Sequence, residues 1–212
     1  YCYERVLGIN TNFAECLNNL GLIFFQAGKY SRAVECYDRS IRYEQDSAEA
    51  HYNLGKVLLA IGREARALAC YQKALEIRPD FLEATVAIGN LHYIAGNYQR
   101  SFQWFDQALA LKPLSHEILE ALGNTLRFLG DLDGAFAYFR RALEVKPDAH
   151  KVFISIGNTH RTLKNMDQAI SSYRKALEYD PGSIPALNNL AIALADAGYT
   201  EAAILAFDGM LA

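Results

Sequence analysis

Amide and guanidinium side chains recur at a fixed interval along this chain. Asn90, Asn124 and Asn158 are separated by 34 residues each, and Arg127 and Arg161 follow the last two after three further residues. On a helix, a spacing of three places each arginine on the same face as its asparagine. An amide both donates and accepts hydrogen bonds, which suits the backbone of an extended peptide, and arginine offers a planar fork for a carboxylate or phosphate. These residues therefore predict peptide recognition.

The sequence carries no pattern typical of catalysis or metal binding. It has no C-x-x-C, no H-E-x-x-H, no G-x-S-x-G and no phosphate-binding glycine loop. Cys2, Cys36 and Cys70 are 34 residues apart, so they are one recurring position seen three times. Small apolar packing in a reducing compartment explains such cysteines, which favours a cytoplasmic location. We therefore expect no enzyme activity, no catalytic residue, no cofactor and no metal site.

The same interval governs the residues that must position these side chains. Glycine recurs at Gly21, Gly55, Gly89, Gly123 and Gly157. An aromatic column runs through Tyr3, Tyr37, Tyr71, Phe105, Phe139, Tyr173 and Phe207, and a proline column through Pro79, Pro113, Pro147 and Pro181. Self-similarity at a fixed period of this length is the signature of a repeat protein.

Each repeating unit reads as two amphipathic helices joined by a tight turn. The predicted helices cover 14–27, 30–43, 48–61, 64–77, 82–95, 98–111, 116–129, 132–145, 150–163, 166–179, 184–197 and 200–211. Glycine ends the first helix in most units, while Lys164-Asn165 occupies that turn in the fifth unit, where asparagine is the next best residue. The prolines stop the second helices, and Asp80 and Asp148 are expected to cap the helices that follow.

The small, aromatic and proline columns resemble the tetratricopeptide repeat, and the resemblance covers nearly the whole chain. It implies an all-α fold, a right-handed superhelical α-solenoid of tandem 34-residue helix-turn-helix repeats. We expect one domain over residues 1–212, with a tail of a preceding repeat at 1–13 and a truncated last repeat, which suggests a fragment of a longer protein. The repeats are expected at 14–47, 48–81, 82–115, 116–149, 150–183 and 184–212.

In this family the first helix of each repeat lines a concave groove that binds peptides. Transferred to this chain, the resemblance implies a peptide-binding groove. Its residues would be Asn53, Lys56, Asn90, Tyr93, Asn124, Arg127, Lys151, Asn158 and Arg161. The first helix of the fifth unit contains basic residues and no acid, so an acidic segment or C-terminal carboxylate is the expected ligand there.

Composition limits the other classes of partner. A net charge of −3 with no basic face argues against nucleic acid, and no apolar run is long enough for membrane insertion. We therefore predict a non-enzymatic scaffold that binds a protein or peptide in its groove. Two alternatives stay open: a substrate-recruiting region of a larger glycosyl- or methyltransferase, and a structural subunit of a trafficking or secretion complex that self-associates through exposed solenoid ends.

Overall fold

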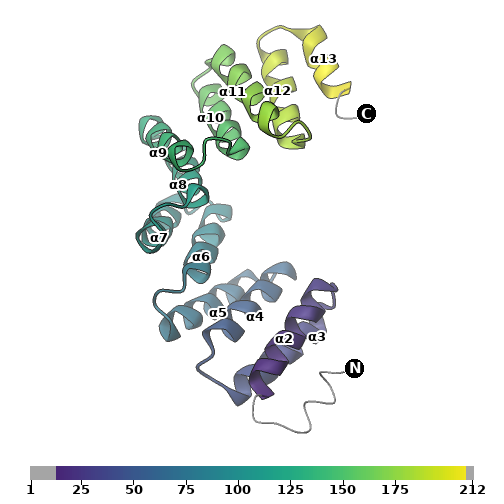
Figure 1. Ribbon diagram of the computed structural model, residues 1–212, viewed down its shortest axis with the longest axis vertical. Coiled ribbons are helices and arrows are strands. Elements are labelled where there is room, and N and C mark those ends of the chain that lie inside the picture. Colours follow the sequence, from purple (N-terminus) through teal and green to yellow (C-terminus); the bar gives the residue numbers. More distant parts are fainter. Residues whose placement is uncertain (1–12, 209–212) are drawn as a thin grey trace. The chain divides into compact units, whose positions relative to one another are not determined.

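The computed structural model describes residues 13–208, and every regular element in that range is an α-helix (Figure 1). The twelve helices are α2 (Phe13–Gln26), α3 (Tyr30–Tyr43), α4 (Ala48–Ala60), α5 (Glu64–Ile77), α6 (Leu82–Ile94), α7 (Tyr98–Leu111), α8 (His116–Leu129), α9 (Leu132–Val145), α10 (His150–Thr162), α11 (Met166–Tyr179), α12 (Ile184–Asp196) and α13 (Thr200–Asp208). The predicted all-α fold of paired helices is confirmed. The predicted helix bounds agree within one residue, except at the end of α13, where residues 209–211 lie outside the described range.

The chain divides into two compact units, residues 1–96 and 97–212, which we describe separately. Within the described residues, the first unit holds α2–α6 and the second holds α7–α13. Where both helices of a repeat lie in the same unit they pack together, as α4 does with α5 and α10 with α11. First helices of successive repeats also touch: α2 contacts α4, and α10 contacts both α8 and α12. Side chains on these first helices can therefore interact from one repeat to the next.

Glycine allows the two helices of a repeat to approach closely. Gly157 of α10 lies against the ring of Tyr173 of α11, and a Cβ atom at residue 157 would lie 2.4 Å from Cε1 of that ring. Gly123 and Phe139 repeat the arrangement in the preceding pair of helices. Full burial of one such ring contributes about 2–3 kcal/mol. The glycine and aromatic columns thus form the seam between the two helices in four repeats, at Gly21, Gly55, Gly123 and Gly157.

The turn after each first helix requires a left-handed residue. Gly28, Gly62, Gly96, Gly130 and Gly198 occupy this position with φ between 70° and 87°. In the fifth repeat Lys164 has φ 60°, whereas Asn165 has φ −87° and is the N-cap of α11. The expectation that asparagine would take the left-handed conformation there is therefore wrong. A residue with a Cβ atom is strained in this conformation. Among the six turn residues, Lys164 is therefore the one whose backbone is strained.

Proline and serine define the ends of several helices. The predicted stops are confirmed: α5 ends at Ile77, two residues before Pro79, and α9 ends at Val145, two residues before Pro147. The capping prediction is wrong for Asp80 and Asp148, because Phe81 and Ala149 are the N-cap residues and neither provides a side-chain hydrogen bond. Side-chain caps come instead from Ser47, Ser115 and Asp131, which accept hydrogen bonds from backbone N–H groups three residues ahead.

The terminal segments of the chain lie largely outside the described residues. The predicted tail at residues 1–13 is described only at Phe13, which begins α2. Within residues 13–208, no helix combines the length and the apolar character that a bilayer crossing requires.

Candidate functional site

A polar network joins the first helices α8 and α10 in the second unit. The amide nitrogen Nδ2 of Asn124 on α8 donates to Ser155 Oγ on α10 at 2.9 Å and to Glu120 Oε1 at 3.4 Å. Ser155 Oγ also donates to Glu120 Oε1 at 3.0 Å. Both N–H groups of the Asn124 amide are thereby used within the protein, and its Oδ1 is the atom left to accept a hydrogen bond.

Asn158 on α10 has the opposite arrangement. Its Oδ1 accepts from the hydroxyl of Tyr173 at 2.8 Å and from Nδ2 of Asn189 on α12 at 3.2 Å. Both lone pairs of this oxygen are engaged, so the Asn158 Nδ2 is the group left to donate. Adjacent asparagines of the predicted ladder therefore present an acceptor at Asn124 and a donor at Asn158. A peptide backbone has both N–H donors and C=O acceptors, so these two side chains can bind one group of each kind.

Glu120 is the half-buried carboxyl of this network. Burial raises the pKa of Glu120, while hydrogen bonds from Ser155 and Asn124 and the positive charge of Lys151 act in the opposite direction. Lys151 itself lies exposed at the start of α10. The carboxyl is thus held between two hydrogen-bond donors and lies near one exposed ammonium group.

Arg127 and Arg161 occupy equivalent positions in the last turns of α8 and α10. Both are half-buried. The Nε of Arg127 and one terminal nitrogen (Nη1) of Arg161 are buried and have no hydrogen-bond partner among the described residues. Neither arginine forms an ion pair within residues 13–208. The structure therefore holds two guanidinium groups with unsatisfied donors on one face.

Polar and aromatic side chains also connect first helices in the first unit. Asn53 Nδ2 on α4 donates to Asn18 Oδ1 on α2 at 3.1 Å. The ammonium of Lys56 lies 5.6 Å from the ring centroid of Phe25 and 5.5 Å from that of Tyr52, which is cation–π distance. Asn90 on α6 is exposed.

The structure places every predicted groove residue on a first helix and links some of them directly. Asn53 and Lys56 lie on α4, and Asn90 and half-buried Tyr93 lie on α6, in the first unit. The second unit carries the others, which are Asn124, Arg127, Lys151, Asn158 and Arg161. The predicted set omitted Glu120, Ser155, Tyr173 and Asn189, whose hydrogen bonds fix the asparagines. The sequence offered a signal for two of these residues, because Ser155 and Asn189 occupy the same repeat position as the predicted Asn53.

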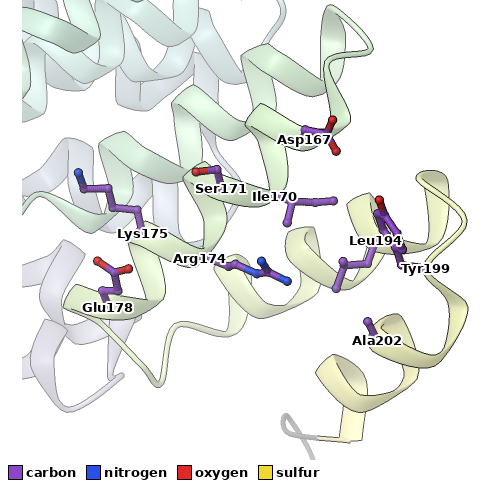
Figure 2. Close-up of a pocket in the computed structure, with 9 residues that line it drawn as sticks. All are labelled: Asp167, Ile170, Ser171, Arg174, Lys175, Glu178, Leu194, Tyr199 and Ala202. Carbon is purple, nitrogen blue, oxygen red and sulfur yellow. The ribbon is translucent and has the colours of Figure 1, made fainter.

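A separate cleft lies between α11 and the last two helices. It has a volume of about 500 Å³, and Ile170, Arg174, Leu194, Tyr199 and Ala202 are among its lining residues. Figure 2 shows Ile170 and Arg174 of α11 extending toward Leu194. None of the predicted groove residues lines this cleft.

Small residues explain why the cleft opens at this point. One repeat earlier, the positions of Ile170 and Leu194 are held by Phe136 and His160, whose ring centroids lie 4.8 Å apart. Ala202 likewise takes the place of a glutamine. Ile170 and Ala202 are smaller than the residues they replace, and Leu194 has no ring, so the ring contact that fills this space in the preceding repeat is absent here. The sequence contained this signal, which we did not foresee.

Within the described residues, no cluster of three or more His, Cys, Asp or Glu side chains could hold a metal ion. Cys70 is a free thiol whose pKa is raised by burial, as expected of a packing residue and not of a nucleophile. The first helices of the second unit thus present hydrogen-bonding groups and positive charge, which can bind a polar or negatively charged ligand.

Comparison with known proteins agrees with this architecture. The family model described as tetratricopeptide repeat matches residues 18–80, 65–116, 120–184 and 155–212. Among curated proteins, no sequence matches this chain at a significant level.

Several solved structures share the fold at low sequence identity. YrrB, titled a TPR protein with an unusual peptide-binding site, is 21% identical with a TM-score of 0.70, over 88% of this chain and 96% of that one. PilW, a type IV pilus biogenesis factor, is 18% identical with a TM-score of 0.81, over 93% and 91% of the two chains. A chain of the APC/C hetero-tetramer Cut9–Hcn1 is 18% identical with a TM-score of 0.80, over 99% of this chain and 42% of that one.

Proposed function

The chain belongs to the tetratricopeptide repeat family, and from this premise we propose that it is a non-enzymatic scaffold that binds an extended peptide along its first helices. Tetratricopeptide repeat proteins generally serve protein–protein interaction. The finer proposal concerns the surface of the second unit that carries Asn124, Arg127, Lys151, Asn158 and Arg161. The four predicted residues of the first unit, which are Asn53, Lys56, Asn90 and Tyr93, are proposed as a separate peptide-binding surface. The ligand is a peptide segment that carries an acidic residue or a C-terminal carboxylate.

The proposal depends mainly on one observation: Asn124 has a free acceptor oxygen, whereas Asn158 has a free donor nitrogen. An extended peptide exposes both N–H and C=O groups, and each needs a partner when it leaves water. Asn124 Oδ1 can accept from a peptide N–H, and Asn158 Nδ2 can donate to a peptide C=O, because internal hydrogen bonds already occupy the other end of each amide. Recognition of this kind reads backbone and not sequence, which suits a scaffold. The peptide-binding site named for YrrB supports the same reading.

A pull-down that compares variants tests the proposal. Asn124→Ala with Lys151→Ala removes one acceptor and one charge and leaves the two arginines in place. The matched control is Gln103→Ala with Lys146→Ala, which also deletes one amide and one ammonium group, at exposed positions on α7 and just after α9. Circular dichroism verifies that both proteins remain helical.

The proposal predicts that partners captured by the wild-type chain are lost from the Asn124/Lys151 variant and kept by the control. Equal recovery by all three proteins would refute binding at this surface. A third variant, Ala202→Gln, restores at the cleft of Figure 2 the residue type of the preceding repeat. Partner loss confined to this third variant would move the binding site to the cleft.

A subunit role in a larger assembly is the second candidate, because α13 exposes apolar side chains. Ile204 is 54% exposed and Leu205 is 72% exposed. The structural neighbours PilW and Cut9–Hcn1 are named for a biogenesis factor and a hetero-tetramer, respectively. Sedimentation of the chain over a range of concentrations tests this candidate. Association that Ile204→Glu with Leu205→Glu abolishes would favour it, and a monomer at all concentrations would count against self-association.

A further inference from the structure

We infer that Arg127 and Arg161 form one oxyanion subsite in the second unit, which holds a single carboxylate or phosphate group of the bound peptide. This inference deepens the proposed function and rests on it. It specifies which residues meet the ligand's negative charge, and it separates them from the amides that meet the backbone.

The two arginines come from equivalent positions on neighbouring helices. Arg127 lies in the last turn of α8 and Arg161 in the last turn of α10, and these two helices pack against each other. Both positive charges act on the same group, because each lowers the pKa of the Tyr173 hydroxyl against the upward effect of burial. The hydroxyl of Tyr173 in turn donates to Asn158. Two guanidinium groups, one phenol and one amide therefore share one locality.

The donors of this locality are incompletely satisfied by the protein. Arg127 Nε and Arg161 Nη1 are both buried without a hydrogen-bond partner among the described residues. The Cζ atom of Arg127 lies 4.1 Å from the ring centroid of Phe128, a cation–π contact that provides no hydrogen-bond acceptor for the guanidinium N–H groups. A buried donor without an acceptor costs free energy, and more so when it carries charge.

Nearby acidic groups do not neutralise the pair. Glu120 is the acidic residue of the adjoining network, and its Oε1 is engaged by Ser155 and Asn124. No carboxylate within residues 13–208 forms an ion pair with Arg127 or Arg161. The partial negative charge at the C-terminal ends of α8 and α10 offsets part of the repulsion between the two cations. It supplies no acceptor to the two buried nitrogens, and an external anion would provide one together with the compensating charge.

An oxyanion suits this arrangement in both charge and geometry. A carboxylate or phosphate presents several acceptor oxygens, and arginine binds them through parallel N–H groups. Asn158 is bonded through Oδ1 to Tyr173, whose hydroxyl both arginines influence, and its Nδ2 is left to donate to the backbone carbonyl of the residue that carries the anion. The expected ligand is thus a peptide residue with an acidic or phosphorylated side chain, or a C-terminal residue.

Small anions test the subsite without knowledge of the partner. The full chain is titrated with sodium acetate or with inorganic phosphate, and sodium chloride keeps the ionic strength constant. Thermal unfolding reports stabilisation, and the guanidinium N–H resonances of the arginines report the location of binding. At tenfold excess over the dissociation constant, we expect the midpoint to rise by roughly 3–5 °C.

The decisive variant is Arg127→Met with Arg161→Met, and the control is Arg100→Met with Arg140→Met at exposed positions on α7 and α9. Both remove two positive charges from the same unit. The Arg127/Arg161 variant should lose the anion response and unfold in chloride at the same temperature as wild type or higher, because burying a methionine leaves no unpaired charge. The control should keep the response. Arg127→Lys with Arg161→Lys retains the charges without the fork, and should bind anions more weakly.

Saturation by acetate assigns the subsite to a carboxylate, and saturation by phosphate alone assigns it to a phosphorylated residue. The inference is overturned if neither anion stabilises the wild-type chain beyond chloride, or if the Arg127/Arg161 variant responds as wild type does. If the anions fail while Asn124→Ala with Lys151→Ala still loses its partners, the scaffold proposal survives and the oxyanion subsite alone is wrong.

Discussion

Replacing Lys164 by glycine should stabilise the protein. Lys164 has φ 60° at a turn where the equivalent residue is glycine in five other repeats. The left-handed conformation costs an L-residue about 1–2 kcal/mol, and glycine removes this cost. Glycine also increases the conformational entropy of the unfolded chain, which lowers the stability of the folded protein by about 0.4–1 kcal/mol. The net gain is about 0.5–1 kcal/mol. Lys164 is exposed, and its N–H bonds only to the carbonyl of Arg161, so the substitution breaks no side-chain contact that the structure shows.

Thermal and denaturant unfolding followed by circular dichroism measure this gain. For a chain of this length, the expected rise in midpoint is about 1–4 °C. The matched control is Lys146→Gly, an exposed lysine with φ −139°. Glycine relieves no strain there, so this control should lower the midpoint. If Lys164→Gly lowers the midpoint as Lys146→Gly does, the assignment of strain to the fifth turn is refuted.

Three further substitutions test the packing, the capping and the polar network. Gly157→Ala should cost about 1–3 kcal/mol, because its Cβ would lie 2.4 Å from the ring of Tyr173. Ser115→Ala should cost about 1 kcal/mol, because Ser115 Oγ accepts the N–H of Ile118 at the start of α8. Burial raises the pKa of Glu120, so its contribution to folding is most favourable below the usual pKa of glutamate and declines as pH rises through the raised value. In the Glu120→Gln variant, the free energy of unfolding should therefore decrease less over this pH range than in the wild type.

Each of these substitutions has a control or a contrary outcome in unfolding experiments. Gly182→Ala should be nearly neutral, because the nearest atom to its Cβ is an Asp180 oxygen at 3.8 Å. Ser183→Ala should cost less than Ser115→Ala, since Ser183 provides no side-chain cap. Equal effects within either pair would contradict the packing or capping argument. For Glu120→Gln, a pH profile of stability identical to that of wild type would show that the carboxyl does not titrate as its burial requires.

The repeat seams could be predicted from the sequence because they depend on residue types that recur in register. Gly157 and Tyr173 are informative in this way: their types and spacing alone indicate close helix packing, which the structure confirms. The helix ends followed from proline and glycine for the same reason. The left-handed Lys164 was missed although it stands in register with the turn glycines, because the prediction followed the intrinsic preference of asparagine for that conformation.

The hydrogen bonds of the polar network depend on distances that the sequence does not contain. The register indicated that Asn124 and Asn158 lie on equivalent faces, but not that one would present oxygen and the other nitrogen. That difference arises because Ser155 and Glu120 take the nitrogen of Asn124, while Tyr173 takes the oxygen of Asn158. Tyr173 was predicted only as a packing residue, and its hydroxyl has this second role.

Site-specific photo-cross-linking tests the central proposal most directly. A photoreactive amino acid replaces Lys151, which is exposed on first helix α10, or Lys146, which is exposed just after second helix α9. We predict a covalent adduct with a partner peptide at position 151. This adduct should be absent at position 146 and should be diminished by an excess of the anion that fills the Arg127–Arg161 subsite. Adducts of equal yield at both positions, or at 146 alone, would contradict binding along the first helices.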